Sequence, residues 1–301
     1  MKNYGGPVMS NPVTLYNIWY GYGASNGGDD IFAAMVKMND FLISLDGGQA
    51  YFTALYGAEA VAAFNVNGVY SLDGVSPFRI SPYLNLASLY GATTSIGFAG
   101  NEAHPLEYLG RNLTHRNIAQ IVTDAISLNN WPSSTDAIYN VITAPDIVVL
   151  GDGLDGTIVC GFHSDVGGLK YTWVGELGAA DCTGGTLSDG LTTIASHELF
   201  ETLTDPMGSE GFRLGPPYAW LDSSQGEIAD MCEDGAFRTE MAFGTFAVQS
   251  IFVSDPSYSA GGYCSSGLST AVTTTPEPAS MVLVATGLLF GLGVAARRRN
   301  N

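Results

Sequence analysis

The hydrophobic pattern divides the first 250 residues into short strands and amphipathic helices. The run Val13–Tyr20 (VTLYNIWY) is rich in aromatic and β-branched residues and predicts a strand. Apolar residues at helical spacing predict helices over residues 29–45, with an acidic cap, and 114–129. Further strands are predicted at residues 68–72, 78–81, 94–98, 146–150, 157–163, 169–175 and 245–253.

Residues 191–206 (LTTIASHELFETLTDP) predict a helix that separates acidic from apolar side chains. At about 100° per residue, His197, Glu198, Glu201 and Asp205 share one face. The opposite arc carries an apolar stripe suited to packing on a core. The helix is therefore expected to have one acidic face and one buried face.

His197, Glu198 and Glu201 form an HExxE motif. A metalloprotease HExxH helix places two ligands at i and i+4, and the intervening glutamate activates a bound water. By this pattern His197 and Glu201 are candidate metal ligands and Glu198 is the candidate catalytic base. Zinc is the expected cofactor, with manganese or calcium as alternatives because a carboxylate makes the site harder. The same spacing also fits a histidine hydrogen-bonded to a carboxylate on a solvated face.

A second acidic stretch, GEIADMCED, follows the helix. In zincins with a glutamate as third ligand, that residue lies beyond the helix and a nearby aspartate orients a ligand histidine. Glu227 is therefore the predicted third ligand and Asp230 the orienting residue. Asp205 is the alternative third ligand, although Asp205 and Pro206 also indicate a helix stop. His163 lies on a predicted strand before the helix and is a weaker candidate for supporting the site.

The order of elements predicts an α/β fold, a mixed β-sheet with covering helices on one side, and the HExxE helix gives this expected fold a zincin-like resemblance. The helix at 191–206 is the active-site helix, and an irregular C-terminal portion carries Glu227. The domain is expected to span residues 1–253. Strand Leu169–Gly175 is expected to be the edge along which an extended peptide substrate pairs.

Composition supports a globular core and excludes one class of partner. The chain has 301 residues, 46% of them hydrophobic and 11% aromatic, which is sufficient for a sizeable core. Lys and Arg number 11 against 29 Asp and Glu, for a formal net charge of -18. Such a surface repels phosphate backbones, so nucleic acid is not an expected partner.

The C-terminal tail differs in kind from the body. Residues 279–296 carry no charge and are followed by Arg297, Arg298 and Arg299, which predicts a transmembrane helix with its basic end in the cytoplasm. Residues 254–275 are rich in Ser, Thr and Gly and are expected to form a linker. Residues 1–10 contain no apolar signal-peptide segment, so we expect the natural precursor to begin further upstream.

The chain has four cysteines, and an even number in an exported protein favours disulfides. Proximity along the chain suggests the pairs Cys160 with Cys182 and Cys232 with Cys264. No CxxC spacing is present, which disfavours a cysteine-based zinc site.

The tail resembles the PEP-CTERM sorting signal of Gram-negative bacteria. Pro276, Glu277 and Pro278 precede the hydrophobic span and the basic end, in the order of that signal. The resemblance implies an exosortase-type sorting enzyme as a partner, anchoring in the inner membrane through the tail, and a periplasmic, cell-surface or extracellular body.

The body resembles the Exordium-like, or phosphate-induced, proteins of plant cell walls and bacteria. The resemblance rests on YGGPVMS, LYNIWYG, VCGFHS, YTWVG, SHELFETLTDP and GEIADMCED, in that order. Family members are similar to zincin-type metallopeptidases around the HExxE helix, so His197, Glu198, Glu201, Glu227 and Asp230 carry over. Two functions follow as hypotheses. One is an exported metallopeptidase-like hydrolase of extracellular peptides; the other is a non-catalytic protein of a polysaccharide or protein matrix or envelope.

Overall fold

A computed structural model describes most of the body of the chain. The described residues are 1–22, 29–46, 81, 83–104, 108–150, 160–175, 185–207, 218–222, 224–232, 236–258 and 261–267. All of them belong to one compact unit, Met1–Leu268, and a second unit comprises Ser269–Asn301. The predicted strand at 68–72, nearly all of that at 78–81 and the predicted membrane span at 279–296 lie outside the described residues.

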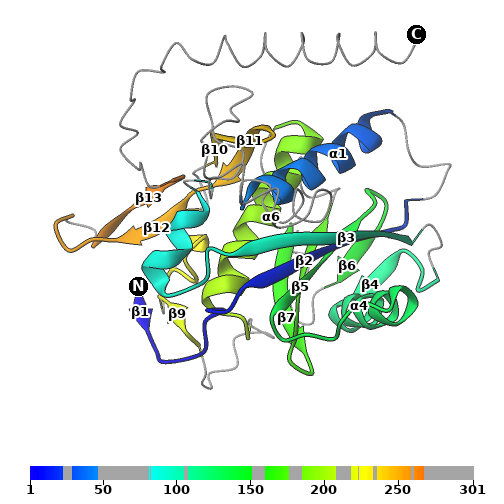
Figure 1. Cartoon of the computed structure of the whole chain (residues 1–301), viewed down its shortest axis with the longest axis horizontal. Coiled ribbons are helices and arrows are strands. Elements are labelled where there is room, and N and C mark those ends of the chain that lie inside the picture. Colours follow the sequence, from blue (N-terminus) through cyan, green and yellow to red (C-terminus); the bar gives the residue numbers. More distant parts are fainter. Residues whose placement is uncertain are drawn as a thin grey trace, which may run out of the picture. The chain divides into compact units, whose positions relative to one another are not determined.

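A five-stranded mixed sheet forms the centre of the body (Figure 1). Its order is β3 (Ile96–His104), β2 (Val13–Tyr20), β5 (Ala137–Thr143), β8 (Leu169–Gly175) and β7 (Gly161–Val166). The first four strands are parallel, and β7 runs antiparallel to β8. The predicted mixed α/β sheet is confirmed, and β2 and β8 have the predicted bounds.

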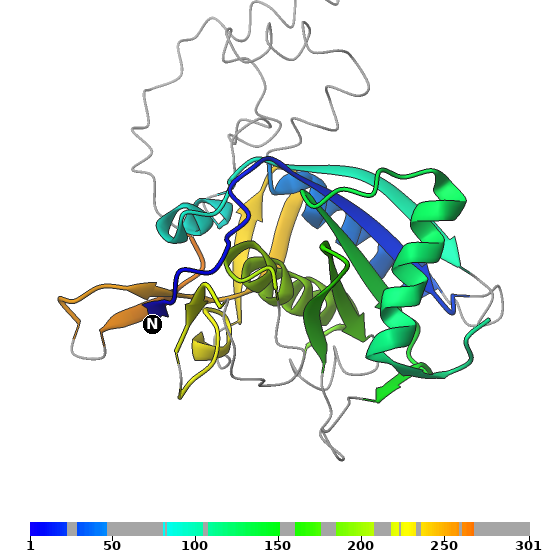
Figure 2. The same ribbon diagram turned by 90° about the horizontal axis from the view of Figure 1, so that it is seen from below.

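Helices cover both faces of this sheet (Figure 2). Helices α1 (Asp29–Ser44) and α6 (Leu187–Thr204) share one hydrophobic core with Leu15 and Trp19 of β2. Helix α4 (His115–Asn129) shares a separate core with Ile18 and Tyr20 of the same strand. The prediction that helices lie on one side only is therefore wrong. A strand with apolar residues on successive positions, such as β2, is typical of a sheet buried on both faces.

Local sequence explains where α4 begins and ends. The Thr114 side chain accepts a hydrogen bond from the Asn117 backbone N–H, and the Asn117 side chain accepts one from the Thr114 N–H, forming a capping box. The helix ends at Asn130, whose φ of 53° is in the left-handed region that terminates helices. The predicted helix at 114–129 is confirmed.

Helix α6 is buried on almost every side rather than being partly solvated. It starts after Thr186, which accepts a hydrogen bond from the Asp189 N–H, and its buried residues run with few breaks from Gly190 to Thr204. The helix packs against β7, β8 and α1, and against β11 (Gly244–Gln249). The expected helix stop is confirmed, because Asp205 is the C-terminal cap. The acidic face of α6 consequently lies inside the protein.

Two hairpins follow the site helix. Strand β10 (Ala236–Met241) pairs with β11, and β12 (Ile251–Ser254) pairs with β13 (Gly262–Ser265). The predicted strand at 245–253 is thus two strands separated at Ser250. The first half of the predicted linker at 254–275 is instead part of this second hairpin, so the body continues beyond residue 253.

Smaller elements complete the described part of the chain. They are η1 (Leu84–Tyr90), the strand pairs β1 (Lys2–Asn3) with β9 (Trp220–Leu221) and β4 (Asn112–Thr114) with β6 (Val148–Leu150), and η2 (Asp230–Cys232). The predicted disulfide between Cys232 and Cys264 is present, with a Cα–Cα distance of 5.8 Å. The other predicted pair includes Cys182, which lies outside the described residues. Across the described elements, no helix is both long and apolar enough to cross a membrane.

Candidate metal centre

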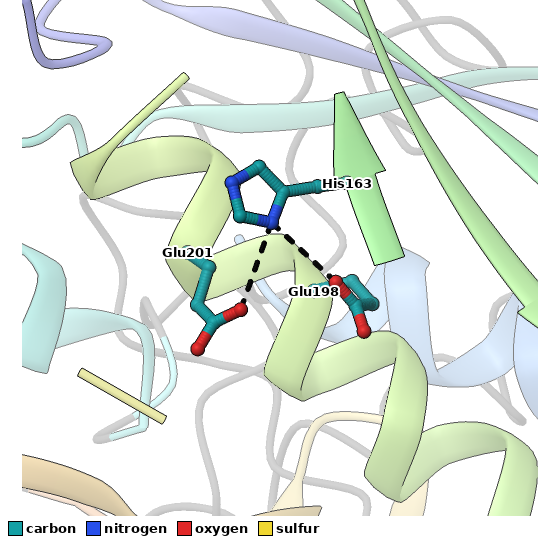
Figure 3. A group of neighbouring side chains, drawn as sticks. All are labelled: His163, Glu198 and Glu201. Carbon is teal, nitrogen blue, oxygen red and sulfur yellow. Dashed lines mark ion pairs between the residues drawn. The ribbon is translucent and has the colours of Figure 1, made fainter. Parts of the chain in front are cut away.

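Three segments that are distant in sequence bring ionisable side chains together around α6. His163 comes from the middle of β7, and His197, Glu198 and Glu201 come from successive turns of α6. The segment 227–230, which ends in η2, supplies two more carboxylates. Figure 3 shows His163 above the helix, with its ring between Glu198 and Glu201.

The first group of possible ligand atoms contains His163, Glu198 and Glu201, all buried. His163 Nδ1 lies 3.5 Å from Glu198 Oε2 and 3.6 Å from Glu201 Oε2. Gly161, two residues before His163, lets β7 approach the helix this closely, because a Cβ there would be 2.6 Å from Glu198 Oε1. The antiparallel β7–β8 pairing therefore brings His163 to the HExxE motif.

The second group contains His197, Glu201 and Asp230. His197 Nε2 lies 3.2 Å from Glu201 Oε2 and 3.4 Å from Asp230 Oδ1. The Asp230 backbone N–H donates to Glu201 Oε1 at 3.2 Å, which fixes this carboxylate against the turn. Glu201 Oε2 is consequently common to both groups.

Most of these separations are longer than good hydrogen bonds. Nitrogen–oxygen hydrogen bonds span about 2.7–3.2 Å. Ligands that share a tetrahedral zinc at roughly 2.0–2.2 Å lie about 3.3–3.6 Å from one another. The measured range of 3.2–3.6 Å between the imidazole nitrogens and carboxylate oxygens matches the ligand spacing around a shared cation.

Two further carboxylates, those of Glu227 and Asp205, are buried near the groups and have few partners. Glu227 Oε1 lies 3.6 Å from His163 Nε2, on the opposite side of the ring from Glu201. Glu227 Oε1 and both carboxylate oxygens of Asp205 have no hydrogen-bond partner among the described residues. A buried carboxylate without good hydrogen bonds is costly unless positive charge lies nearby, and protonated His163 or a metal ion could supply that charge.

The pKa values of the groups reflect this crowding. Burial alone would lower the pKa of His163, but the charges of Glu227, Glu198 and Glu201 outweigh it and raise the pKa to about 10. Burial raises the pKa of Glu198, and it raises that of Glu227 well above the ordinary value. Burial would also raise the pKa of Asp230, but hydrogen bonding and the charge of His197 lower it. The carboxylates thus compete for too few positive charges.

The predicted site residues are brought together, in a different arrangement from the one expected. His197 and Glu201 are neighbours, and Asp230, predicted to orient a ligand, lies at ligand distance itself. Glu227, predicted as the third ligand, lies against His163 and belongs to neither group within the described residues. His163 is more central than its isolated position on a strand suggested. Only the spatial pairing of β7 with β8 reveals this role.

The donor set fits a divalent metal ion. Imidazole nitrogens with carboxylate oxygens suit zinc, and the high share of carboxylates also suits manganese. The His163 Nε2 atom lies 3.1 Å from the Asp205 carbonyl oxygen, a support of the kind that fixes the orientation of ligand histidines.

Comparisons with known proteins give two findings. Residues 274–299 match the PEP-CTERM protein-sorting motif. The chain is similar to Protein EXORDIUM-like 5 of Arabidopsis thaliana, with 26% identity over 268 residues covering 76% of this chain and 62% of that protein. It is also similar to Protein EXORDIUM-like 3 of the same plant, with 24% identity over 266 residues. This match covers 76% of this chain and 67% of that protein.

No solved structure matches the chain. The sorting motif supports export and implies an exosortase-type sorting partner. The chain spans 62% of the length of the first relative and 67% of the second. It is therefore a distant relative of the Exordium-like proteins that carries a PEP-CTERM sorting motif at its C-terminus.

Proposed function

We propose that this protein is an exported, metal-dependent peptidase-like hydrolase whose centre lies on α6. The observation that carries the proposal is the meeting of His197, Glu201 and Asp230 at ligand distances next to Glu198. The sorting motif supports an extracytoplasmic place of action.

Each side chain has a role that follows from its position. His197 and Glu201 hold the ion, with Asp230 as the third ligand on geometry and Glu227 as the alternative from sequence. The ion, when bound, acts as a Lewis acid and lowers the pKa of a bound water. Glu198 accepts the proton of that water, and its burial keeps its pKa above the ordinary glutamate value, closer to the working pH of a general base.

The proposed substrate is a peptide or protein in an extended conformation. Strand β8, predicted to be the edge that binds it, lies between β5 and β7, so that expectation is wrong. Strand β7 is the terminal strand of the sheet in the described part of the chain, and His163 lies on it. Main-chain pairing with β7 would place a substrate carbonyl near the centre.

The test combines metal analysis with an activity assay on the purified full chain. Elemental analysis should find zinc, and a peptide library should be cleaved by the zinc-loaded protein. Glu198→Gln should bind zinc and lose at least about 100-fold in rate, as loss of a general base costs. Glu240→Gln, an exposed position on β10, is the matched control. Absence of metal, or equal activity of wild type and Glu198→Gln, would remove the proposal.

The second candidate is a non-catalytic extracellular protein with a structural cation. The burial of Glu198 and Glu201, which are 4% and 3% exposed, favours it, because catalytic sites keep an open position and structural ones are closed. In that case a chelator should lower the melting temperature although no member of the peptide library is cleaved.

A further inference from the structure

The protonation of His163 is set by its backbone neighbour. Its Nε2 atom lies 3.1 Å from the carbonyl oxygen of Asp205, and a carbonyl oxygen can only accept a hydrogen bond. Nε2 therefore carries a proton and donates it to Asp205. In the neutral ring, Nδ1 then presents a lone pair.

That lone pair faces two carboxylate oxygens. Nδ1 lies 3.5 Å from Glu198 Oε2 and 3.6 Å from Glu201 Oε2, and all three side chains are buried (Figure 3). Three electron-pair donors that converge in a buried space repel one another unless a cation lies between them. The cation is either a proton, on Nδ1 or on one of the carboxyl groups, or a metal ion.

The surrounding charge favours a metal ion over a proton. Glu227 Oε1 is buried, has no hydrogen-bond partner among the described residues, and lies 3.6 Å from the same imidazole. Five carboxylates face two imidazoles, so even with both rings protonated the excess of negative charge is removed only if several buried carboxyls also take up protons or a metal ion binds. The carboxylates are those of Glu198, Glu201, Asp205, Glu227 and Asp230.

Glu201 lies between the two groups in a bridging position. Its Oε2 atom is 3.2 Å from His197 Nε2 and 3.6 Å from His163 Nδ1, yet the two histidines belong to separate ligand groups. A carboxylate shared by two sets of ligands is a common feature of sites that hold two ions roughly 3.5–4 Å apart.

We propose that the protein has a second divalent-cation site, bounded by His163, Glu198 and Glu201, which shares Glu201 with the site of His197 and Asp230. Filling this second site engages Glu198 as a ligand, so Glu198 can no longer accept a proton. An excess of the cation should consequently inhibit the enzyme. The inhibition rests on the proposed function, whereas the second site itself does not.

Binding stoichiometry tests the site independently of activity. The purified full chain is stripped with a chelator, titrated with Zn²⁺ and analysed for bound metal. We expect two equivalents of zinc in the wild type and one in His163→Ala. Loss of a supporting partner costs roughly 10- to 100-fold in metal affinity, and loss of the ligand His163 should lower the affinity for the second zinc by more than that. His115→Ala, which changes a histidine on α4, should retain two.

A spectroscopic measurement on the wild type covers the case in which His163→Ala does not fold. The first equivalent of Co²⁺ should give an electron paramagnetic resonance signal, and the second should diminish it, because two ions that share Glu201 are magnetically coupled. Two independent signals, a single equivalent, or two equivalents that survive in His163→Ala would each overturn the second site. A protein that binds no metal at all would overturn the proposed function as well. Two coupled equivalents, with no peptide cleavage even at one equivalent of zinc, would remove only the hydrolase.

Discussion

Gly161 lies directly against Glu198. A Cβ atom at position 161 would come within 2.6 Å of Glu198 Oε1 and 2.6 Å of Ile194 Cγ2, and it would be 3.0 Å from the Trp173 carbonyl oxygen. The Glu198 oxygen could move, but the Trp173 backbone could not do so without disturbing the β7–β8 pair. The glycine is therefore what allows a strand to pass over the acidic face of α6.

Gly161→Ala should damage the centre and lower stability together. We expect a loss of about 1–3 kcal/mol in the free energy of unfolding, as for overpacking of a core. The displaced Glu198 should also weaken zinc binding or catalysis, measured by titration and by peptide cleavage. Gly100→Ala on β3 is the control, because its nearest neighbour would be Trp131 at an ordinary 3.4 Å. Equal effects of the two substitutions would contradict this reading of Gly161.

The third ligand can be identified by comparing two substitutions. Asp230 Oδ1 lies 3.4 Å from His197, whereas Glu227 lies against His163. Asp230→Asn should therefore lower the affinity for the first zinc by at least about 10-fold, and more than Glu227→Gln does. Isothermal titration of zinc into the stripped full chain measures both. The reverse order would restore Glu227 as the third ligand, as the sequence predicted.

Sequence periodicity predicted individual elements better than their arrangement. The strand at 13–20 and the helix at 114–129 were recognisable because their side chains repeat with the period of the structure they form. Two other features depend on strand order. One is the side of the sheet on which α4 packs, and the other is that β7, rather than the predicted β8, lies at the edge of the sheet. Strand order arises from long-range pairing, which local patterns do not encode.

The candidate site likewise has one part that local sequence predicts and one part that depends on long-range pairing. His197, Glu198 and Glu201 lie within five residues, so helical spacing alone brings them together. His163 is 34 residues before His197 and reaches the group only through the β7–β8 pair. The wrong linker assignment has a related cause. The Ser-, Thr- and Gly-rich composition of residues 254–275 predicted a linker, but a Cβ at Gly262 would collide with Phe252 and Val253 across the β12–β13 pair, so this glycine is needed for packing.

The disulfide between Cys232 and Cys264 should stabilise the site as well as the fold. It joins the end of η2, which carries Asp230, to β13, with a sequence separation of 32. Closing a loop of this length contributes about 3–4 kcal/mol in the chain-entropy model. The double substitution Cys232→Ala with Cys264→Ala should lower stability by this amount and also weaken zinc binding. Unchanged zinc affinity would show that the 227–230 segment keeps its position without the disulfide, through its contacts with α6 and with Phe252 of β12.

Asp205 should make the metal-free protein less stable as pH rises. Burial raises the pKa of its carboxyl from 3.8 to about 6, so the folded state binds a proton that the unfolded state releases. For an acid with a raised folded pKa, stability is greatest below the unfolded pKa and is lost as pH rises through the folded pKa. In chelator, Asp205→Asn should therefore be more stable than wild type, by a margin that grows from pH 4 to pH 7.

Thermal melts of the full chain at each pH measure this margin, with the exposed Glu240→Gln as the control. The sign should change when zinc is added. A cation near the unpaired Asp205 oxygens is stabilised by their negative charge, so Asp205→Asn should then lower the melting temperature relative to wild type. A variant that is more stable than wild type both with and without zinc would show that the Asp205 carboxylate contributes nothing to metal binding. The buried charge would then have to be explained without the ion.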